Sequence, residues 1–205
     1  MQAQKLGVQK WAVLLLIGLT GQFAWTIENM YFNVFLYNTI STDPSYIAAM
    51  VAWSAAVATV TTLLVGAWSD RVGKLRFVLP AAGVMLAGLV GMFYARGMLA
   101  VTIAGIVMMS GYMLVTAALS ANVRDWTPPD KAGHFQGIRM IFAVLLPMII
   151  GPAIGSAVIR GSDSTYVELG VVKTVPTPSI FLAAAAVLLL VVIPVIILRR
   201  REHKC

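Results

Sequence analysis

The stretch GAWSDRVGKLR, residues 66–76, lies between two long apolar segments and indicates the fold of the whole chain. Four of its eleven residues carry a charge, whereas the flanking segments 45–68 and 77–95 contain no Asp, Glu, Lys or Arg outside it. A transmembrane helix needs about 20 apolar residues, and both segments meet that length. We therefore expect a short polar turn that joins two transmembrane helices on one side of a bilayer.

Six such apolar segments occur along the 205 residues and leave room only for short linkers. Their expected bounds are residues 11–36, 45–68, 77–95, 99–121, 137–160 and 179–198. The first is slightly long for one crossing, so it is expected to tilt, or to break near Gly18 and Gly21. The longest linker, 161–178, is too short for a soluble domain. The sequence thus predicts an all-α membrane protein in which residues 1–205 form one bundle of six transmembrane helices.

The composition excludes several classes of protein. Hydrophobic residues make up 60% of the chain and charged residues 11%, against about 25% charged in soluble domains. One cysteine cannot form a disulfide framework. The net charge of +7 comes from residues beside the apolar segments, which argues for a lipid surface and against a nucleic-acid partner. No phosphate-binding loop, metal-ligand spacing or nucleophile–base set is present, so we expect neither an enzyme nor a cofactor.

The placement of the basic residues predicts the orientation. Twelve of the 15 Lys and Arg residues fall on the side that carries both chain ends, and only Arg96, Arg160 and Lys173 fall on the other. Loops rich in Lys and Arg stay in the cytoplasm. Both termini are therefore expected to be cytoplasmic, with the chain in the plasma (inner) membrane.

The polar turn also carries a specific motif. It resembles the loop signature of the major facilitator superfamily, G-x-x-x-D-R-x-G-R/K-R/K, and it lies after the second span, as in that family. The matching residues are Gly66, Asp70, Arg71, Gly73, Lys74 and the basic end at Arg76. The resemblance implies one six-span bundle, built from two inverted three-helix repeats, of a transporter with two such bundles. It also implies transport of a small polar solute by alternating access.

Two sets of small residues are expected to pack helices against each other. In the fifth span, Gly151, Pro152 and Gly155 resemble part of the G-P-x-x-G-G motif of facilitator antiporters. A kinked packing helix explains them better, so the motif does not by itself indicate an antiporter. A proton antiporter that exports drugs or metabolites stays as an alternative function. In the third span, Gly83, Ala87 and Gly91 recur four residues apart, which is typical of a helix-packing face.

The loop at residues 122–139 has the character of the same superfamily and is nearest to its sugar–cation symporters. That branch carries acidic residues in spans two and four, whereas here those spans contain none. The resemblance therefore favours a sugar-like solute and a proton, rather than sodium, as the coupling ion. It also implies a partner for this bundle: either a second copy of the chain or a C-terminal half. A membrane subunit that pairs without transporting is the alternative from another class.

Glu28 is the clearest ionisable residue inside a span. Such residues are costly in lipid and usually functional. Three roles stay open: carrying the coupled proton, binding a polar substrate, or contacting water at the interface.

Polar and aromatic residues near Glu28 are the candidates for substrate binding. On the first helix, four of them fall at positions i, i+4, i+7 and i+11, which places them in one stripe that should face protein or water. An aromatic residue beside amide groups suits sugar recognition. The candidates are Gln22, Trp25, Thr26, Asn29 and Asn33 in the first span, and Tyr112 and Thr116 in the fourth.

Overall fold

A computed structural model describes residues 2–40, 43–72, 74–162, 164–168 and 170–196, without the side chains of 2–9, 67–72, 74–75, 129 and 168. The elements are α1 (Gln2–Thr39), α2 (Pro44–Val72), α3 (Lys74–Tyr94), α4 (Met98–Asp125), a 3-10 turn (Pro129–Lys131), α5 (Ala132–Met140), the π-helix η2 (Ile141–Leu145), α6 (Leu146–Ile159), β1 (Thr165–Glu168), β2 (Val171–Thr174) and α7 (Ser179–Leu189).

The described residues contain six helical segments long and apolar enough to cross a membrane, so the predicted all-α membrane fold is confirmed. They cover Lys10–Thr39, Pro44–Gly66, Arg76–Tyr94, Met98–Asp125, Ala132–Ile159 and Ser179–Ile196. The first segment is one continuous helix, without the break that was expected near Gly18 and Gly21. Its hydrogen-bond ladder tolerates both glycines because an isolated glycine costs a helix only about 1 kcal/mol.

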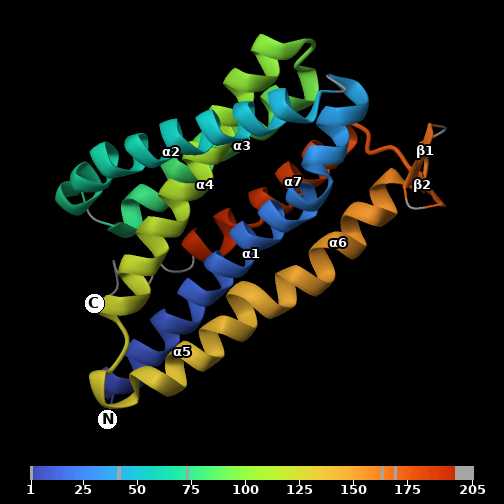
Figure 1. The fold of residues 1–205 in the computed structure, drawn as a ribbon. Helices are drawn as coiled ribbons and strands as arrows, with labels where there is room; N and C mark the ends of the chain where they lie inside the picture. The colour runs from blue at the N-terminus through green and yellow to red at the C-terminus, as the bar shows by residue number, and fades with distance from the viewer. Residues whose placement is uncertain (1, 41–42, 73, 163, 169, 197–205) are drawn as a thin grey trace.

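Helix α1 runs through the bundle between α6 and α7 on one side and α4 on the other (Figure 1). Helices α3 and α4 form the most extensive pair, and α2 packs mainly on α4. The start of α1 and α5 lie together at one end of the bundle, which we call the α5 end. The end of α1 and the strands β1 and β2 lie at the opposite end, the hairpin end (Figure 1).

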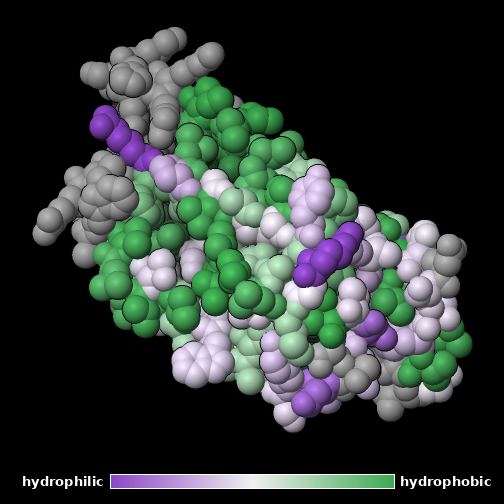
Figure 2. Space-filling view, turned by 90° about the horizontal axis from the view of Figure 1, so that it is seen from above, coloured by the Kyte–Doolittle hydropathy of each residue, from purple (hydrophilic) through white to green (hydrophobic). Residues whose placement is uncertain are grey.

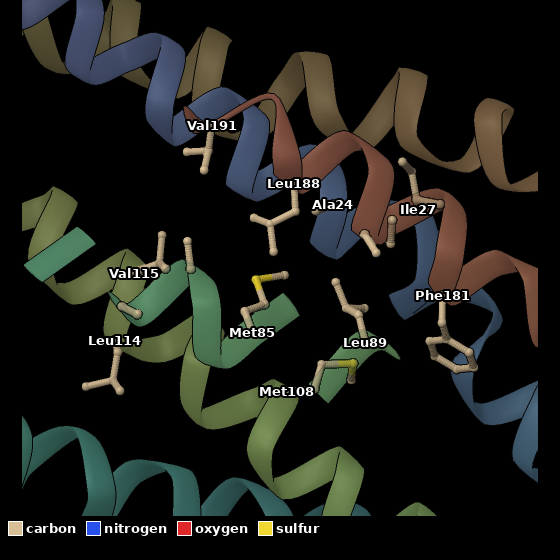
Figure 3. Packing of buried hydrophobic residues seen from close by; sticks show 14 of the residues in the cluster. Ala24, Ile27, Met85, Leu89, Met108, Leu114, Val115, Phe181, Leu188 and Val191 are labelled. Carbon is tan, nitrogen blue, oxygen red and sulfur yellow. The ribbon is translucent and has the colours of Figure 1, made fainter. Parts of the chain in front are cut away.

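The core forms where α1 and α7 meet α3 and α4 (Figure 3). Met85 and Leu89 of α3 and Leu188 of α7 are fully buried there. Gly88 faces the Met108 backbone so closely that any side chain would collide with it. This face of α3 makes the closest helix contact. On the expected face, a Cβ on Gly83 would meet nothing within 4 Å, whereas one on Gly91 would lie 3.4 Å from the Ala104 Cβ, an ordinary contact.

Prolines interrupt two of the spans. Pro147 lacks an N–H, and its ring crowds the carbonyl of Ala143, four residues earlier; the chain widens there into the π-helix Ile141–Leu145. Pro194 acts in the same way on the last span, where α7 ends and the backbone N–H of Leu190 bonds three residues back to Val187 at 3.1 Å. The fifth span is therefore an α-helix interrupted by a π-helix that was not predicted.

The linker after α6 forms a hairpin that was not predicted. Strands β1 and β2 pair antiparallel, with Thr165 opposite Thr174 and Glu168 opposite Val171. Gly170 in the turn has φ +79°, a conformation that favours glycine. The hairpin extends from the bundle beside the end of α1 (Figure 1).

Much of the surface is apolar. Figure 2 shows hydrophobic side chains gathered over large areas of one face, with hydrophilic groups in separate patches. The segments Pro44–Gly66 and Ala132–Ile159 are the least covered: 22% and 17% of an 18-residue apolar window in each is buried, against 44–50% in the other four. Their outer faces, which include Leu63, Leu64, Met148 and Ile149, suit lipid or a second membrane bundle.

Candidate functional site

Glu28 lies in the second half of α1, eleven residues before the end of the helix, and is only 1% exposed. Neither carboxyl oxygen has a hydrogen-bond partner within the described part of the chain. Its neighbours Ala24 and Ile27 on the same helix are fully buried in the apolar core (Figure 3). An ionised carboxylate without a partner is strongly disfavoured in such surroundings. This conformation is therefore compatible with a protonated carboxyl that is shielded from bulk solvent.

An aromatic pair joins α1 to α4 one turn before Glu28. The rings of Trp25 and Tyr112 stack with their centroids 4.1 Å apart and their planes 10° from parallel. The Tyr112 hydroxyl donates a hydrogen bond to Gln22 Oε1 at 3.2 Å. The structure thus brings three of the predicted binding residues together, and in this conformation the face of Trp25 is occupied by Tyr112.

A cleft lies on the α5-end side of this pair, between α1, α4 and α5, and we call it the inner cleft. It is lined by Gly18 and Gln22 of α1, Tyr112, Thr116 and Ser120 of α4, and Arg139 of α5, together with apolar side chains. The Arg139 guanidinium donates a hydrogen bond from Nη2 to Ser120 Oγ at 2.7 Å. The free volume is about 40 Å³, which is room for a few water molecules.

Arg139 was not predicted as a site residue and was considered only among the basic residues that set the orientation. The available signal was its position after Phe135 and Ile138, inside an apolar helix rather than in the preceding polar loop. The structure shows α5 beginning at Ala132, so Arg139 lies two helical turns inside the helix.

Aromatic contacts hold the helices together at the α5 end of the bundle, beyond the inner cleft. Trp11 Nε1 donates a hydrogen bond to Thr127 Oγ1 at 3.2 Å, and the Trp11 ring meets the Phe135 ring edge-on with centroids 4.6 Å apart. Lys10 Nζ lies 4.6 Å from the Trp126 ring centroid. These contacts join the start of α1, the end of α4 and the start of α5.

A larger cavity of about 740 Å³ opens at the hairpin end, between α1, α2 and β1. Asn33 and Asn38 of α1 contribute polar groups to its wall, and Ile47 and Val51 of α2 face them with apolar groups. Tyr166 of the hairpin closes one side. The bundle therefore combines a wide cavity at the hairpin end with a narrow cleft toward the α5 end.

The expected polar stripe on α1 is divided among different surroundings. Gln22 faces the inner cleft and Asn33 the larger cavity, whereas Asn29 is exposed. Thr26 bonds to the backbone of its own helix, with Oγ1 donating to the Gln22 carbonyl at 2.9 Å. The structure does not bring these four residues to one wall of a single cavity.

The Gly151–Gly155 motif holds α6 against α1. A Cβ on Gly151 would collide with Thr26, and one on Gly155 would lie 2.7 Å from the Ile27 carbonyl oxygen. The Tyr31 hydroxyl donates a hydrogen bond to the Pro152 carbonyl at 3.0 Å. This motif therefore has a packing role in the structure.

The signature turn is described only in part. Helix α2 ends at Val72 and α3 begins at Lys74; Gly66 has open space beside it, and Arg76 is exposed. Gly73 and the side chains of Asp70, Arg71 and Lys74 lie outside the described residues. Among the residues that are described, no three His, Cys, Asp or Glu side chains come together as metal ligands would.

Comparison with known proteins agrees with this architecture. A family model described as Major Facilitator Superfamily matches residues 14–204, which is nearly the entire chain. No curated protein matches the chain.

Proposed function

This chain belongs to the major facilitator superfamily, a family of secondary transporters rather than enzymes, and we propose that it moves a small polar solute, coupled to a proton, by alternating access. A sugar-like solute is the specific candidate. The pairing of Trp25 and Tyr112 with the Gln22 amide supports it, because aromatic rings and amide groups together suit polyhydroxylated molecules.

The buried Glu28 carboxyl is the observation that carries the coupling proposal. A proton carrier must be stable in its protonated form in one conformation and lose the proton in another. Glu28 is enclosed without a partner among the described residues in this conformation, which favours the protonated form. A rearrangement that admits water or a cation would favour release.

The proposed transporter contains a second six-span bundle, supplied by another copy of this chain or by a C-terminal half. The faces of α2 and of the α5–α6 span support this, because they are the least covered in the bundle. We further propose that the chain lies in the plasma (inner) membrane with both ends in the cytoplasm, as the uneven distribution of Lys and Arg indicates.

Glu28→Gln tests the coupling role. In proteoliposomes, with a radiolabelled panel of hexoses, pentoses and small organic acids, this variant should lose uphill accumulation driven by a pH gradient. It should still exchange solute across the membrane at nearly the unsubstituted rate, because glutamine keeps the shape and the neutral state of the side chain. The matched control is Met30→Ala, two residues along α1 and exposed, which should accumulate solute normally.

Two results would contradict the coupling role. Unchanged uphill accumulation by Glu28→Gln would remove Glu28 from the mechanism. A change in solute affinity alone, with accumulation kept, would assign Glu28 to substrate binding instead.

A further inference from the structure

The inner cleft contains a positive charge and no negative one. Its lining includes the Arg139 guanidinium, and none of the described residues around it is Asp or Glu. No ion pair to Arg139 occurs within the described part of the chain; its recorded hydrogen-bond partner is the neutral Ser120 hydroxyl, 2.7 Å from Nη2. An arginine at this depth normally pairs with an anion, because an uncompensated charge near lipid is costly.

Several polar groups around Arg139 have hydrogen-bond donors that are not used within the described part of the chain. A guanidinium has five N–H donors, and one of them is used on Ser120. Ser120 accepts that bond, so its own hydrogen is available to a ligand. The Thr116 hydroxyl and the Gln22 amide nitrogen have no hydrogen-bond partner among the described residues, while the Gln22 oxygen is already taken by Tyr112.

These donors surround one space. Thr116 and Ser120 are one turn apart on α4, and Gly18 and Gln22 are one turn apart on α1. A Cβ on Gly18 would meet nothing within 4 Å, so the cleft has open room on the α1 side. A neutral sugar could also hydrogen-bond to these hydroxyl groups, but it would leave the Arg139 charge without a counter-ion, whereas an anion would neutralise it.

We propose that the inner cleft binds an oxyanion, the carboxylate or phosphate group of a small solute, with Arg139 as its charge partner. Arginine matches both groups because its planar fork can donate two parallel hydrogen bonds. The inference rests on the proposed function, since it narrows the transported solute from a polar molecule to an organic anion, and within the sugar-like class to an acid or a phosphate ester. Co-transport of one proton with a monoanion would then be electrically neutral.

The first test measures the charge preference of the cleft without any transport. Thr116→Cys is made in a Cys205→Ser background, and the purified protein reacts with two methanethiosulfonates, one bearing a sulfonate and one a trimethylammonium group. The rate constant of the sulfonate reagent divided by that of the trimethylammonium reagent should be at least about tenfold higher at position 116 than for a free thiol in solution. The reason is that a nearby fixed positive charge concentrates anions. Adding Arg139→Gln should remove this preference, and Arg139→Lys should keep most of it.

A matched control separates a local effect from a general one. Val172→Cys lies on the exposed hairpin, and its ratio of reaction rates should not change when Arg139→Gln is added. Equal preference at position 116 with and without Arg139 would overturn the proposal. So would failure of both reagents at position 116 while position 172 reacts, since the cleft would then be closed to solutes.

The second test identifies the anion. Lactate and propane-1,2-diol share their carbon skeleton and differ in one carboxylate, and inorganic phosphate represents the phosphate group. Lactate or phosphate should slow the labelling of the Thr116→Cys variant by the neutral reagent methyl methanethiosulfonate, and Arg139→Gln should abolish that protection. The anion that protects more strongly shows whether the cleft prefers a carboxylate or a phosphate group. Equal protection by the diol, or none by either anion, would contradict an oxyanion site.

The experiments distinguish a failure of the oxyanion-site proposal from a failure of the proposed transport function. The labelling measurements use no gradient and no vesicle, so they can fail while proteoliposomes still accumulate a neutral solute. Conversely, a charge-selective cleft in a protein without uphill transport would retain the anion site and remove the transporter proposal.

Discussion

Gly83 and Gly88 lie on the same helix, yet their surroundings differ completely. Gly88 packs on the backbone of Met108, and on α4 Gly111 packs in the same way on the backbone of Met85. The four-residue spacing of Gly83, Ala87 and Gly91 predicted a packing face, but spacing alone does not say which side of a helix meets its neighbour. That side is set by the helices around it, which the sequence of α3 does not contain.

Gly88→Ala should therefore destabilise the protein. The new methyl group would overlap the Met108 backbone, which cannot move away like a flexible side chain, and overpacking of this kind costs about 1–3 kcal/mol. Thermal unfolding of the detergent-solubilised protein, followed by thiol exposure or circular dichroism, should show a lower midpoint. Gly83→Ala is the control and should leave the midpoint unchanged or raise it, since alanine favours helix. Equal effects at both positions would show that the α3–α4 packing is described wrongly.

At the scale of the element, the fifth span shows what periodicity can and cannot predict. Its length and apolar composition predicted a transmembrane segment, and its Gly151–Gly155 motif fitted a kinked packing helix. The π-helix was not predicted, because a proline can be accommodated by a bend, a 3-10 turn or a wider turn, and the choice depends on neighbouring helices. Arg139 lies on α5, directly before this π-helix, so we expect the local irregularity to set the orientation of Arg139 toward the inner cleft.

Pro147→Ala should test this connection. With its N–H restored, the segment can return to a regular helix, which removes the extra residue of the wide turn and rotates α5 by about 100° relative to α6. Arg139 should then leave Ser120. In the Thr116→Cys background, the preference for the sulfonate reagent should fall to nearly that of Arg139→Gln. A full preference in Pro147→Ala would show that the π-helix does not position Arg139.

For the whole molecule, composition was sufficient to predict six membrane-crossing helices, because the bilayer imposes a length and a polarity on each one. The signature residues identified the family. The hairpin and the separation of Gln22 from Asn33 could not be predicted in the same way, because both depend on how α1 packs against α2, α4 and α6. The sequence therefore predicted which residues are candidates for the site, whereas only the structure showed that they are divided between two cavities.

The orientation can be measured by cysteine labelling in intact cells. In a Cys205→Ser background, Val172→Cys on the hairpin should react with a membrane-impermeant maleimide, whereas His134→Cys on α5 should react only after the membrane is opened. Both positions are exposed in the structure, so a difference reports the side of the membrane. Labelling of position 134, but not 172, in intact cells would reverse the orientation.

Pairing of two copies has its own test. In a two-fold assembly, Asp70 of one copy is expected near the start of the fifth span of the other, because a helix start attracts a carboxylate with about 0.3–2 kcal/mol. Asp70→Cys and Gln136→Cys, placed in separate copies, should crosslink between chains. Transport by a protein that stays monomeric and does not crosslink would contradict the two-copy assembly.

The most direct test of the central claim is solute accumulation driven by a pH gradient alone. Purified protein in proteoliposomes, with an acidic exterior, should accumulate a member of the panel of hexoses, pentoses and small organic acids above its external concentration. Accumulation should stop when a protonophore collapses the gradient, and a sodium gradient should not replace it. Accumulation only with an acidic interior would indicate the antiporter instead. Solute that merely equilibrates, or does not enter, under every gradient would contradict proton-coupled transport by this chain.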